Sequence, residues 1–249
     1  MRITITLYVL WLLAACNSIQ KQNEIIVARE TTAPATTESP PAQIEEDFGF
    51  EAKAKAIGLT DIAMLDSSIA IRIAYSTKDN FTKTDLYGTF DKAYLIDGYA
   101  KKITAAQIKL KQLHPHYTLV IYDAARPVVV QQKLWDQAQL PESTKRLYLS
   151  KPEQNSLHNY GAAIDLAILD STGKQLDFGS TYDFFGEEAQ PRFEQKLLKQ
   201  GKLTNHQIEN RKLLRSLMLS VGFTSIQTEW WHYNACSRVY AKNNFKLLN

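Results

Sequence analysis

The chain has few cysteines, and this excludes the class of exported proteins that depend on many disulfides. Only Cys16 and Cys236 occur among its 249 residues, whereas disulfide-dependent domains contain many more. If Cys16 is modified, Cys236 has no partner within the chain. Hydrophobic residues make up 45% of the sequence, so we expect a core stabilised by packing alone. Cys236 is then a small buried side chain rather than a metal ligand or nucleophile.

The sequence also lacks an excess of basic residues and an apolar stretch long enough to span a membrane. The 29 Lys and Arg nearly balance the 26 Asp and Glu, and no basic stripe occurs, so nucleic acid is not an expected partner. The apolar run at residues 3–13 is shorter than the roughly 20 residues that span a bilayer. Because Arg2 precedes this run and small residues follow it, the N-terminus indicates an export signal.

The signal ends in Leu13-Ala14-Ala15-Cys16, which has the pattern of a bacterial lipobox. An acylated Cys16 would then be the first residue of the mature chain. The alternative is an ordinary secretory signal that happens to contain a cysteine. We expect residues 1–16 to be a lipoprotein signal peptide with Cys16 as the lipidation site. The protein would be exported and anchored by its lipid to a bacterial membrane, facing the periplasm.

Composition divides the rest of the chain into a tether and a domain. Residues 17–47 are rich in Thr, Ala, Pro, Ser and Glu and show no apolar periodicity, so they cannot bury enough surface to fold. We expect them to form a flexible tether that lifts the domain from the membrane. Residues 48–249 are then the catalytic domain.

The pattern within residues 48–249 mixes helices and strands without a regular alternation of the two. Apolar alternation and apolar runs predict strands at residues 69–73, 117–122, 162–168 and 228–233. Apolar residues at helical spacing predict helices at residues 98–113, 127–136 and 205–221. These patterns favour an α+β fold with a mainly antiparallel sheet flanked by helices, and with a metal site in a cleft on the sheet.

Histidines are the main candidates for binding a metal, and there are five of them. His114 and His116 flank a proline in a turn, and His206 begins a predicted helix. For these three, a solvated surface histidine is the better interpretation. His158 and His232 differ because acidic side chains lie close to them in the sequence.

His158 lies in a predicted loop, and Asp165 lies in the strand that follows. On that strand Asp165 shares a face with Ala163 and Ala167, the residues two positions before and after it, and both have small side chains. Residues of the opposite face, which can fill the core, are Ile164, Leu166 and Ile168. Small neighbours leave space beside a carboxylate, as a metal site requires. For this segment alone, a buried Asp that caps a turn is the better interpretation.

Glu229 and His232 form an E-x-x-H pattern in an aromatic segment. A catalytic zinc takes three protein ligands and leaves one position for water, and a general base must reach that water. Glu229 and His232 could act as base and ligand if a bulge or twist at the intervening Trp pair turns both to one face. An aromatic core strand with an incidental Glu and His is the alternative, and the pattern is weak by itself.

In combination, these segments resemble a known family. H-x6-D at His158 and Asp165, followed by E-x-W-H at Glu229 and His232, is similar to the zinc-binding pattern of the VanX-type D-alanyl-D-alanine dipeptidases. Three further segments are similar to that family and occur in its order, at residues 75–88, 122–127 and 178–185. The likeness covers residues 57–233, nearly the whole predicted domain.

The resemblance implies a ligand set and a base. One Zn²⁺ per chain would be held by His158, Asp165 and His232. Glu229 would be the general base.

The resemblance also implies a substrate pocket. Arg126 would stabilise the oxyanion, Ser156 and Asp183 would bind the free amino group of the substrate, and Tyr75 would line the pocket wall. From the sequence alone, an Arg126 paired with Asp123 is an equally good interpretation of the Y-D-x-x-R-P segment.

The implied activity is zinc-dependent hydrolysis of D-alanyl-D-alanine to two D-alanines in cell-wall peptide metabolism. The partners are therefore this small dipeptide and, through the lipid anchor, a membrane. One alternative is a D,D- or L,D-carboxypeptidase that trims peptidoglycan stem peptides with the same zinc set and an open pocket. Another is a non-catalytic wall-binding lipoprotein, which the presence of all three ligands and the base argues against.

Overall fold

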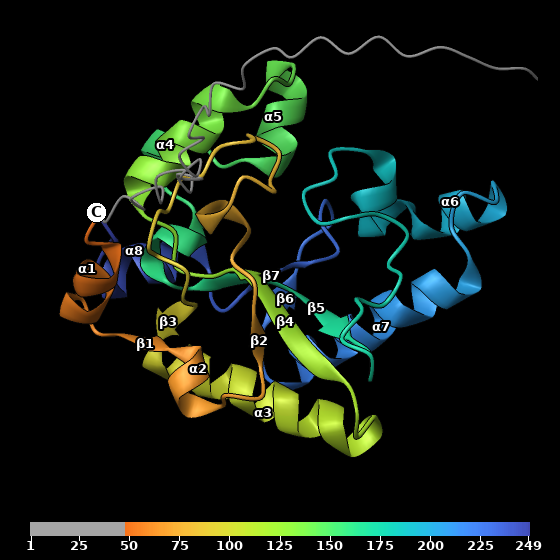
Figure 1. The fold of residues 1–249 in the computed structure, drawn as a ribbon. Helices are drawn as coiled ribbons and strands as arrows, with labels where there is room; N and C mark the ends of the chain where they lie inside the picture. Colours follow the sequence, from red (N-terminus) through yellow and green to blue (C-terminus); the bar gives the residue numbers. More distant parts are fainter. Residues whose placement is uncertain (1–47) are drawn as a thin grey trace, which may run out of the picture. The chain divides into compact units, whose positions relative to one another are not determined.

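A computed structural model describes residues 48–249 of the protein (Figure 1). The predicted signal peptide, the lipidation site Cys16 and the predicted tether lie outside the described residues. Within residues 48–249, helices and strands combine in an α+β arrangement, which confirms the predicted class. No helix in this part of the chain is both long and apolar enough to span a membrane.

A five-stranded sheet forms the centre of the described region, in the order β2-β4-β5-β7-β6. Its strands are β2 (Ala70–Ile71), β4 (Thr118–Asp123), β5 (Ala163–Leu169), β6 (Thr224–Ser225) and β7 (His232–Asn234). β2 runs parallel to β4, whereas the other pairs are antiparallel. The sheet is therefore mixed, and the prediction of a mainly antiparallel sheet is corrected. Between β2 and β4 the chain passes through a helix, the kind of crossover that joins parallel strands.

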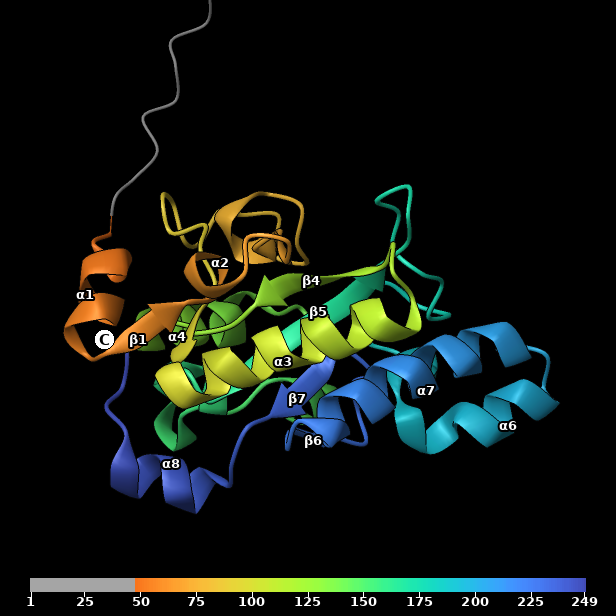
Figure 2. The same cartoon turned by 90° about the horizontal axis from the view of Figure 1, so that it is seen from below.

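Helices cover both sides of the sheet. Figure 1 shows α3 (Asp97–Leu113) and α7 (Asn205–Ser220) on one side, with α4 (Val128–Gln137) and α5 (Glu142–Tyr148) on the other. Figure 2 shows α3 lying across β4 and β5, with α7 beside it. Helical spacing accounts for the packing of α3, whose buried residues include Ala100, Ile103, Ala106 and Leu110. The metal and substrate candidates lie between the sheet and the segments on the α5 side.

The remaining elements are short. The helices are α1 (Phe50–Ala56), α2 (Ile62–Leu65), α6 (Glu194–Lys199) and α8 (Arg238–Asn244), and β1 (Leu59–Asp61) pairs with β3 (Tyr94–Ile96) in a separate antiparallel ribbon. Short 3₁₀ helices occur at Ala74–Ser76, Pro152–Gln154, Leu157–Tyr160, Glu187–Ala189 and Pro191–Phe193. Several of these short helices contribute residues to the walls of the candidate site.

Two local predictions need correction. The segment predicted as a strand at residues 228–233 becomes a strand only at β7, because the backbone of Trp230 hydrogen bonds to Ala189 outside the sheet (N to O, 3.1 Å). Cys236, predicted as a buried side chain, is half-buried and lines a cavity. It follows β7, where the chain turns away from the core towards α8.

Candidate active site

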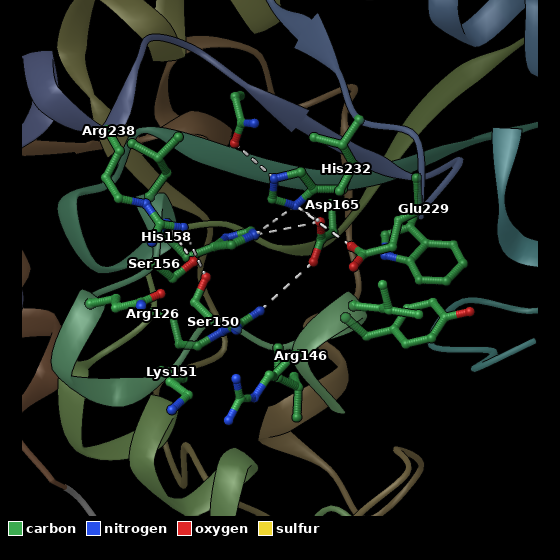
Figure 3. A pocket seen from close by; sticks show the side chains of 18 of the residues that line it. Arg126, Arg146, Ser150, Lys151, Ser156, His158, Asp165, Glu229, His232 and Arg238 are labelled. Atoms are coloured by element: carbon green, nitrogen blue, oxygen red, sulfur yellow. Dashed lines mark hydrogen bonds and ion pairs between the residues drawn. The ribbon is translucent and has the colours of Figure 1, made fainter. Parts of the chain in front are cut away.

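Three predicted ligands converge on one point above the sheet (Figure 3). One donor atom from each of His158, Asp165 and His232 lies within 4.8 Å of the other two. Nδ1 of His232 is 2.9 Å from Oδ1 of Asp165 and 3.2 Å from Nε2 of His158. Nε2 of His158 is 3.5 Å from the same Asp165 oxygen. The side chains are 74 residues apart at the extremes, so the fold brings them together.

Strand register explains the position of Asp165 and His232. Asp165 of β5 is directly paired with His232 of β7 on one side and with Asp123 of β4 on the other. Residues opposite each other on neighbouring antiparallel strands have Cβ atoms about 4.5–5.5 Å apart on the same face. The carboxylate and the imidazole therefore meet as a direct consequence of the sheet.

His158 reaches the same point from the 3₁₀ helix Leu157–Tyr160. Ser156 caps this turn: its Oγ accepts from the backbone N of His158 at 3.3 Å, and its own N donates to the Asn159 side chain at 2.7 Å. The chain then reverses into β5 at Gly161, which has φ +64°, and a Cβ there would lie 2.8 Å from a Leu59 methyl. Only glycine satisfies both the backbone angle and the close approach.

Both imidazoles are oriented by a second partner. Nδ1 of His158 donates to the carbonyl oxygen of Ala124 at 2.6 Å, so its Nε2 carries the lone pair. Nε2 of His232 lies 2.8 Å from Oδ1 of Asn234 and donates to it, so its Nδ1 carries the lone pair. Such outer partners typically fix metal-binding histidines.

The resulting donor set suits a metal ion. Two imidazole lone pairs and one carboxylate oxygen face one another at 2.9–3.5 Å, an arrangement that repels unless a cation or a proton lies between them. Asp165 also accepts from Tyr182 Oη at 3.2 Å. Burial alone would raise the pKa of Asp165, but the positive charge that His158 and His232 carry when protonated, together with their hydrogen bonds, holds this pKa far below its usual range. The group stays an anion, and the set fits zinc among other metals.

Glu229 lies beside this cluster without being part of it. Its Oε2 is 3.9 Å from Nδ1 of His232, and only 8% of the residue is exposed. Glu229 lies just before β7, in a segment without regular secondary structure. The alternation of side chains along a strand therefore does not turn Glu229 and His232 to opposite faces. A departure from strand geometry at the intervening Trp pair is expected from the sequence. Burial raises the pKa of the Glu229 carboxyl to about 8. A carboxyl with such a pKa can both hold and release a proton near neutral pH.

Arg126 satisfies both interpretations of its segment. Its Nε donates to Oδ2 of Asp123 at 2.8 Å, and its Nη1 donates to Oε1 of Gln131 at 2.8 Å. Asp123 in turn accepts from Tyr87 Oη at 2.8 Å. The guanidinium also lines the cavity, with Nη2 3.8 Å from Oδ2 of Asp165. The ion pair with Asp123 therefore holds Arg126 against the cluster.

Asp183 and Tyr75 lie together on another wall of the cavity. Tyr75 Oη donates to Oδ2 of Asp183 at 2.8 Å, and the Tyr75 ring is 5.4 Å from the Arg126 Cζ. Asp183 has a left-handed backbone with φ +56°, which is uncommon for a residue other than glycine. Burial raises the pKa of its carboxyl to about 8. Ser156 also lines the cavity, so the structure brings all the predicted substrate residues around one space.

That space is a cavity of about 730 Å³, which is in the usual range for a small-molecule site. Every predicted metal, catalytic and substrate residue of the domain lies on its walls. The structure adds residues that the sequence did not reveal. Asn234 could have been found, since it lies two residues after His232 and shares its strand face. Gln131 gave no signal, because its contact with Arg126 depends on how the chain enters α4 after Pro127.

Comparisons with known proteins agree with this geometry. The sequence profile of a family described as D-ala-D-ala dipeptidase matches residues 55–248. A protein of Escherichia coli (strain K12), named D-alanyl-D-alanine dipeptidase, is 31% identical over 179 residues, which are 70% of this chain and 83% of that protein. A protein of the same name from Enterococcus faecium is 27% identical over 206 residues, covering 76% of this chain and 96% of its own. One from Synechocystis is 27% identical over 172 residues, 58% and 70% of the two chains.

Proposed function

The chain belongs to the D-ala-D-ala dipeptidase family of metallopeptidases, and from that premise we propose that it hydrolyses D-alanyl-D-alanine to two D-alanines with one Zn²⁺ per chain. The observation that carries the proposal is the convergence of two imidazole nitrogens and a carboxylate oxygen within 4.8 Å, beside the buried carboxyl of Glu229 and the guanidinium of Arg126, which is fixed by its partners.

His158, Asp165 and His232 would hold the zinc. When bound, zinc acts as a Lewis acid that polarises the scissile carbonyl and lowers the pKa of water towards 7. The alternative role of a non-catalytic binding protein leaves the base and the guanidinium beside the cluster without a purpose.

Glu229 is the proposed general base. In its ionised form the carboxylate takes the proton from the attacking water, and in its neutral form it returns that proton to the leaving amine. Burial of the carboxyl raises its pKa, which favours the neutral form that returns the proton in the second step. Its place 3.9 Å from His232 keeps it near the ligands.

Arg126 is the proposed oxyanion partner. Two of its nitrogens are committed to Asp123 and one to Gln131, so the guanidinium cannot rotate away. Nη2 carries two hydrogens, of which Asp123 takes one and the other remains for the developing negative charge. A donor that is already oriented costs no rearrangement at the moment of reaction.

Asp183 and Ser156 are the proposed partners of the substrate's ammonium group, with Tyr75 as pocket wall. The Tyr75 hydroxyl holds one Asp183 oxygen and leaves the other free. Substrate binding would favour the ionised form of Asp183, because an ammonium beside it offsets the effect of burial.

The deciding experiment compares D-Ala-D-Ala with N-acetyl-D-Ala-D-Ala on zinc-loaded protein. Loss of the positive charge leaves the carboxylate unpaired, which costs roughly 3–5 kcal/mol, so we expect kcat/KM to fall by about 10²–10³ or more. Asp183→Ala should reduce the preference by weakening the free dipeptide. Comparable kcat/KM values for the two substrates would support the carboxypeptidase alternative instead.

We propose the membrane address from the sequence alone. The lipobox pattern supports export, acylation at Cys16 and a tether through residue 47, with the domain at residues 48–249. Cys16→Ser should release the protein from membranes or block its processing. Unchanged membrane partition and maturation would show that Cys16 is not an anchor.

A further inference from the structure

The cavity that contains the proposed zinc site has a second, oppositely charged region. Its acidic side chains are Asp165, Asp183 and Glu229. Three basic side chains, Arg146, Lys151 and Arg238, also line it and are here called the basic rim. Figure 3 shows Arg238 and Lys151 on the opposite side of the pocket from Glu229. A substrate that fills the cavity therefore meets acids near the cluster and cations away from it.

Arg238 is the least neutralised cation of the basic rim. Arg146 is paired with Glu142 on α5, and Lys151 lies 3.9 Å from Glu153. Among residues 48–249, Arg238 forms no ion pair, and its Nη2 donates to the neutral Ser150 Oγ at 3.2 Å. A guanidinium has five N–H donors, so several remain for a ligand.

The basic rim is connected to the proposed catalytic arginine through hydrogen bonds. Ser150, the partner of Arg238, accepts through its carbonyl oxygen from Nε2 of Gln131 at 2.9 Å. Oε1 of the same Gln131 accepts from Arg126 at 2.8 Å. Gln131 is fully buried. The distance between the basic rim and Arg126 is thus set by a side chain that is held at both ends.

We propose that the basic rim is a subsite for a carboxylate carried by the leaving residue of the substrate. The inference rests on the proposed function, in which Asp183 and Ser156 take the amino end of the substrate and the residue released as the amine lies on the other side of the scissile bond. A cavity of about 730 Å³ leaves space for a side chain larger than methyl. The substrate class is therefore dipeptides with a small first residue and an acidic second residue, such as D-Ala-D-Glu.

The chemistry of this substrate class is the same hydrolysis. Water supplies the hydroxyl of the new carboxyl group and the hydrogen of the released amine, and the only bond broken is the peptide bond. The products are D-alanine and an acidic D-amino acid. A carboxylate has two sources in such a substrate, the side chain and the C-terminal α-carboxylate, and both match a guanidinium.

The test measures kcat/KM for D-Ala-D-Glu, for its neutral isostere D-Ala-D-Gln and for D-Ala-D-Ala. Wild-type protein should prefer D-Ala-D-Glu over D-Ala-D-Gln by about tenfold, as expected for one charge-assisted hydrogen bond. Arg238→Gln should remove this preference and leave D-Ala-D-Gln nearly unchanged. The matched control is Arg192→Gln, because Arg192 is exposed, bonds to a neutral Gln190 and lies outside the cavity lining.

The outcomes distinguish a subsite for the side-chain carboxylate, a subsite for the α-carboxylate and the absence of any subsite at Arg238. An equal loss for all three dipeptides in Arg238→Gln assigns the subsite to the α-carboxylate. If Arg238→Gln changes none of the three, or no more than Arg192→Gln does, the proposal is overturned.

Binding distinguishes this proposal from the proposed function. Calorimetry on zinc-loaded Glu229→Ala, which should bind without cleaving, gives the ratio of Kd values for D-Ala-D-Glu and D-Ala-D-Gln. A ratio of about ten with no hydrolysis by the wild type would refute the dipeptidase function and support the subsite. Equal Kd values together with hydrolysis of D-Ala-D-Ala would support the dipeptidase function and refute the subsite.

Discussion

The end of the cavity that contains the proposed zinc ligands, here called the zinc end, and the basic rim are built in different ways. At the zinc end the ligands come from the paired strands β5 and β7 and from a capped turn, and each imidazole has a second partner. At the basic rim the cations lie on or beside the short helices α5 and α8, and they are more exposed. The comparison indicates that the side chains proposed to carry the chemistry are fixed by more partners than Arg238, which is proposed to select the substrate.

Removing a ligand should have the largest effect and would test the rigid end directly. Purified protein should contain about one zinc per chain, and His232→Ala should lower zinc affinity by more than the roughly 10–100-fold typical of an outer partner. Metal analysis after dialysis provides the measurement. Asn234→Ala removes only the outer partner of His232 and should fall within that 10–100-fold range.

The control for this prediction is His206→Ala, since His206 is exposed on α7 and outside the cavity. Full zinc occupancy in a protein that lacks both His158 and His232 would contradict the ligand assignment. That result would also remove the contrast between the zinc end of the cavity and the basic rim.

Glu229→Ala should separate metal binding from chemistry. Because Glu229 is not a proposed ligand, the variant should keep its zinc, while kcat should fall by roughly 10²–10⁴ as a general base is lost. Steady-state kinetics and metal content on the same sample provide the measurement. Glu209→Ala, at an exposed position of α7, is the matched control. Turnover close to that of the wild type would place the base elsewhere.

Arg126→Ala should lower kcat by about 10²–10³, which is typical of a lost oxyanion donor. It should also lower stability, because Asp123 is fully buried and loses its ion pair. Arg126→Lys keeps the charge without the two-nitrogen contact to Asp123 and should recover stability better than kcat. If both Arg126 variants lost stability and kept kcat, the residue would have a purely structural role.

Asp183 should make the zinc end sensitive to pH. Its pKa is raised to about 8 by burial, above the roughly 3.9 of an unfolded Asp. Between about pH 3.9 and pH 8 the folded state therefore binds more protons than the unfolded state. The contribution of Asp183 to the free energy of unfolding is lost as pH rises towards 8. Relative to Asp183→Asn, the wild type should lose at most ~1.4 kcal/mol of unfolding free energy per pH unit. Urea unfolding of both proteins between pH 5 and pH 9 tests this, and parallel curves would refute it.

Breaking the Arg146–Glu142 pair at the basic rim should have the smallest effect. Both side chains are more than half exposed and are spaced i,i+4 on α5, so their interaction contributes only about 0.3–0.5 kcal/mol. Glu142→Gln should therefore leave the melting temperature nearly unchanged. A loss comparable to that of Arg126→Ala would show that the rim is as rigid as the zinc end.

Much of the fold followed from local patterns. The helices predicted at residues 98–113 and 205–221 appear as α3 and α7 with ends shifted by one residue, because apolar spacing and clear stop signals act locally. The strand at residues 162–168 was predicted for the same reason and appears as β5. The parallel pairing of β2 with β4 could not be predicted, since β2 has only two residues and its partner lies about fifty positions away.

The site shows the same division. The sequence by itself determined which side chains are available: two histidines with acidic neighbours, a carboxyl near the second of them and an arginine before a proline. It also determined the family, through the spacing and order of these motifs. Only the tertiary structure decided that Asp165 and His232 meet across paired strands, that Asn234 and Ala124 orient the imidazoles, and that Arg238 reaches the same cavity. The physical reason is that the contacts of Asp165 with His232, of Ala124 with His158 and of Arg238 with Ser150 join residues 34 to 88 positions apart, and such separations close only when the sheet and its loops have packed. Asn234 is only two residues from His232, but the strand that aligns the two side chains forms only within the sheet.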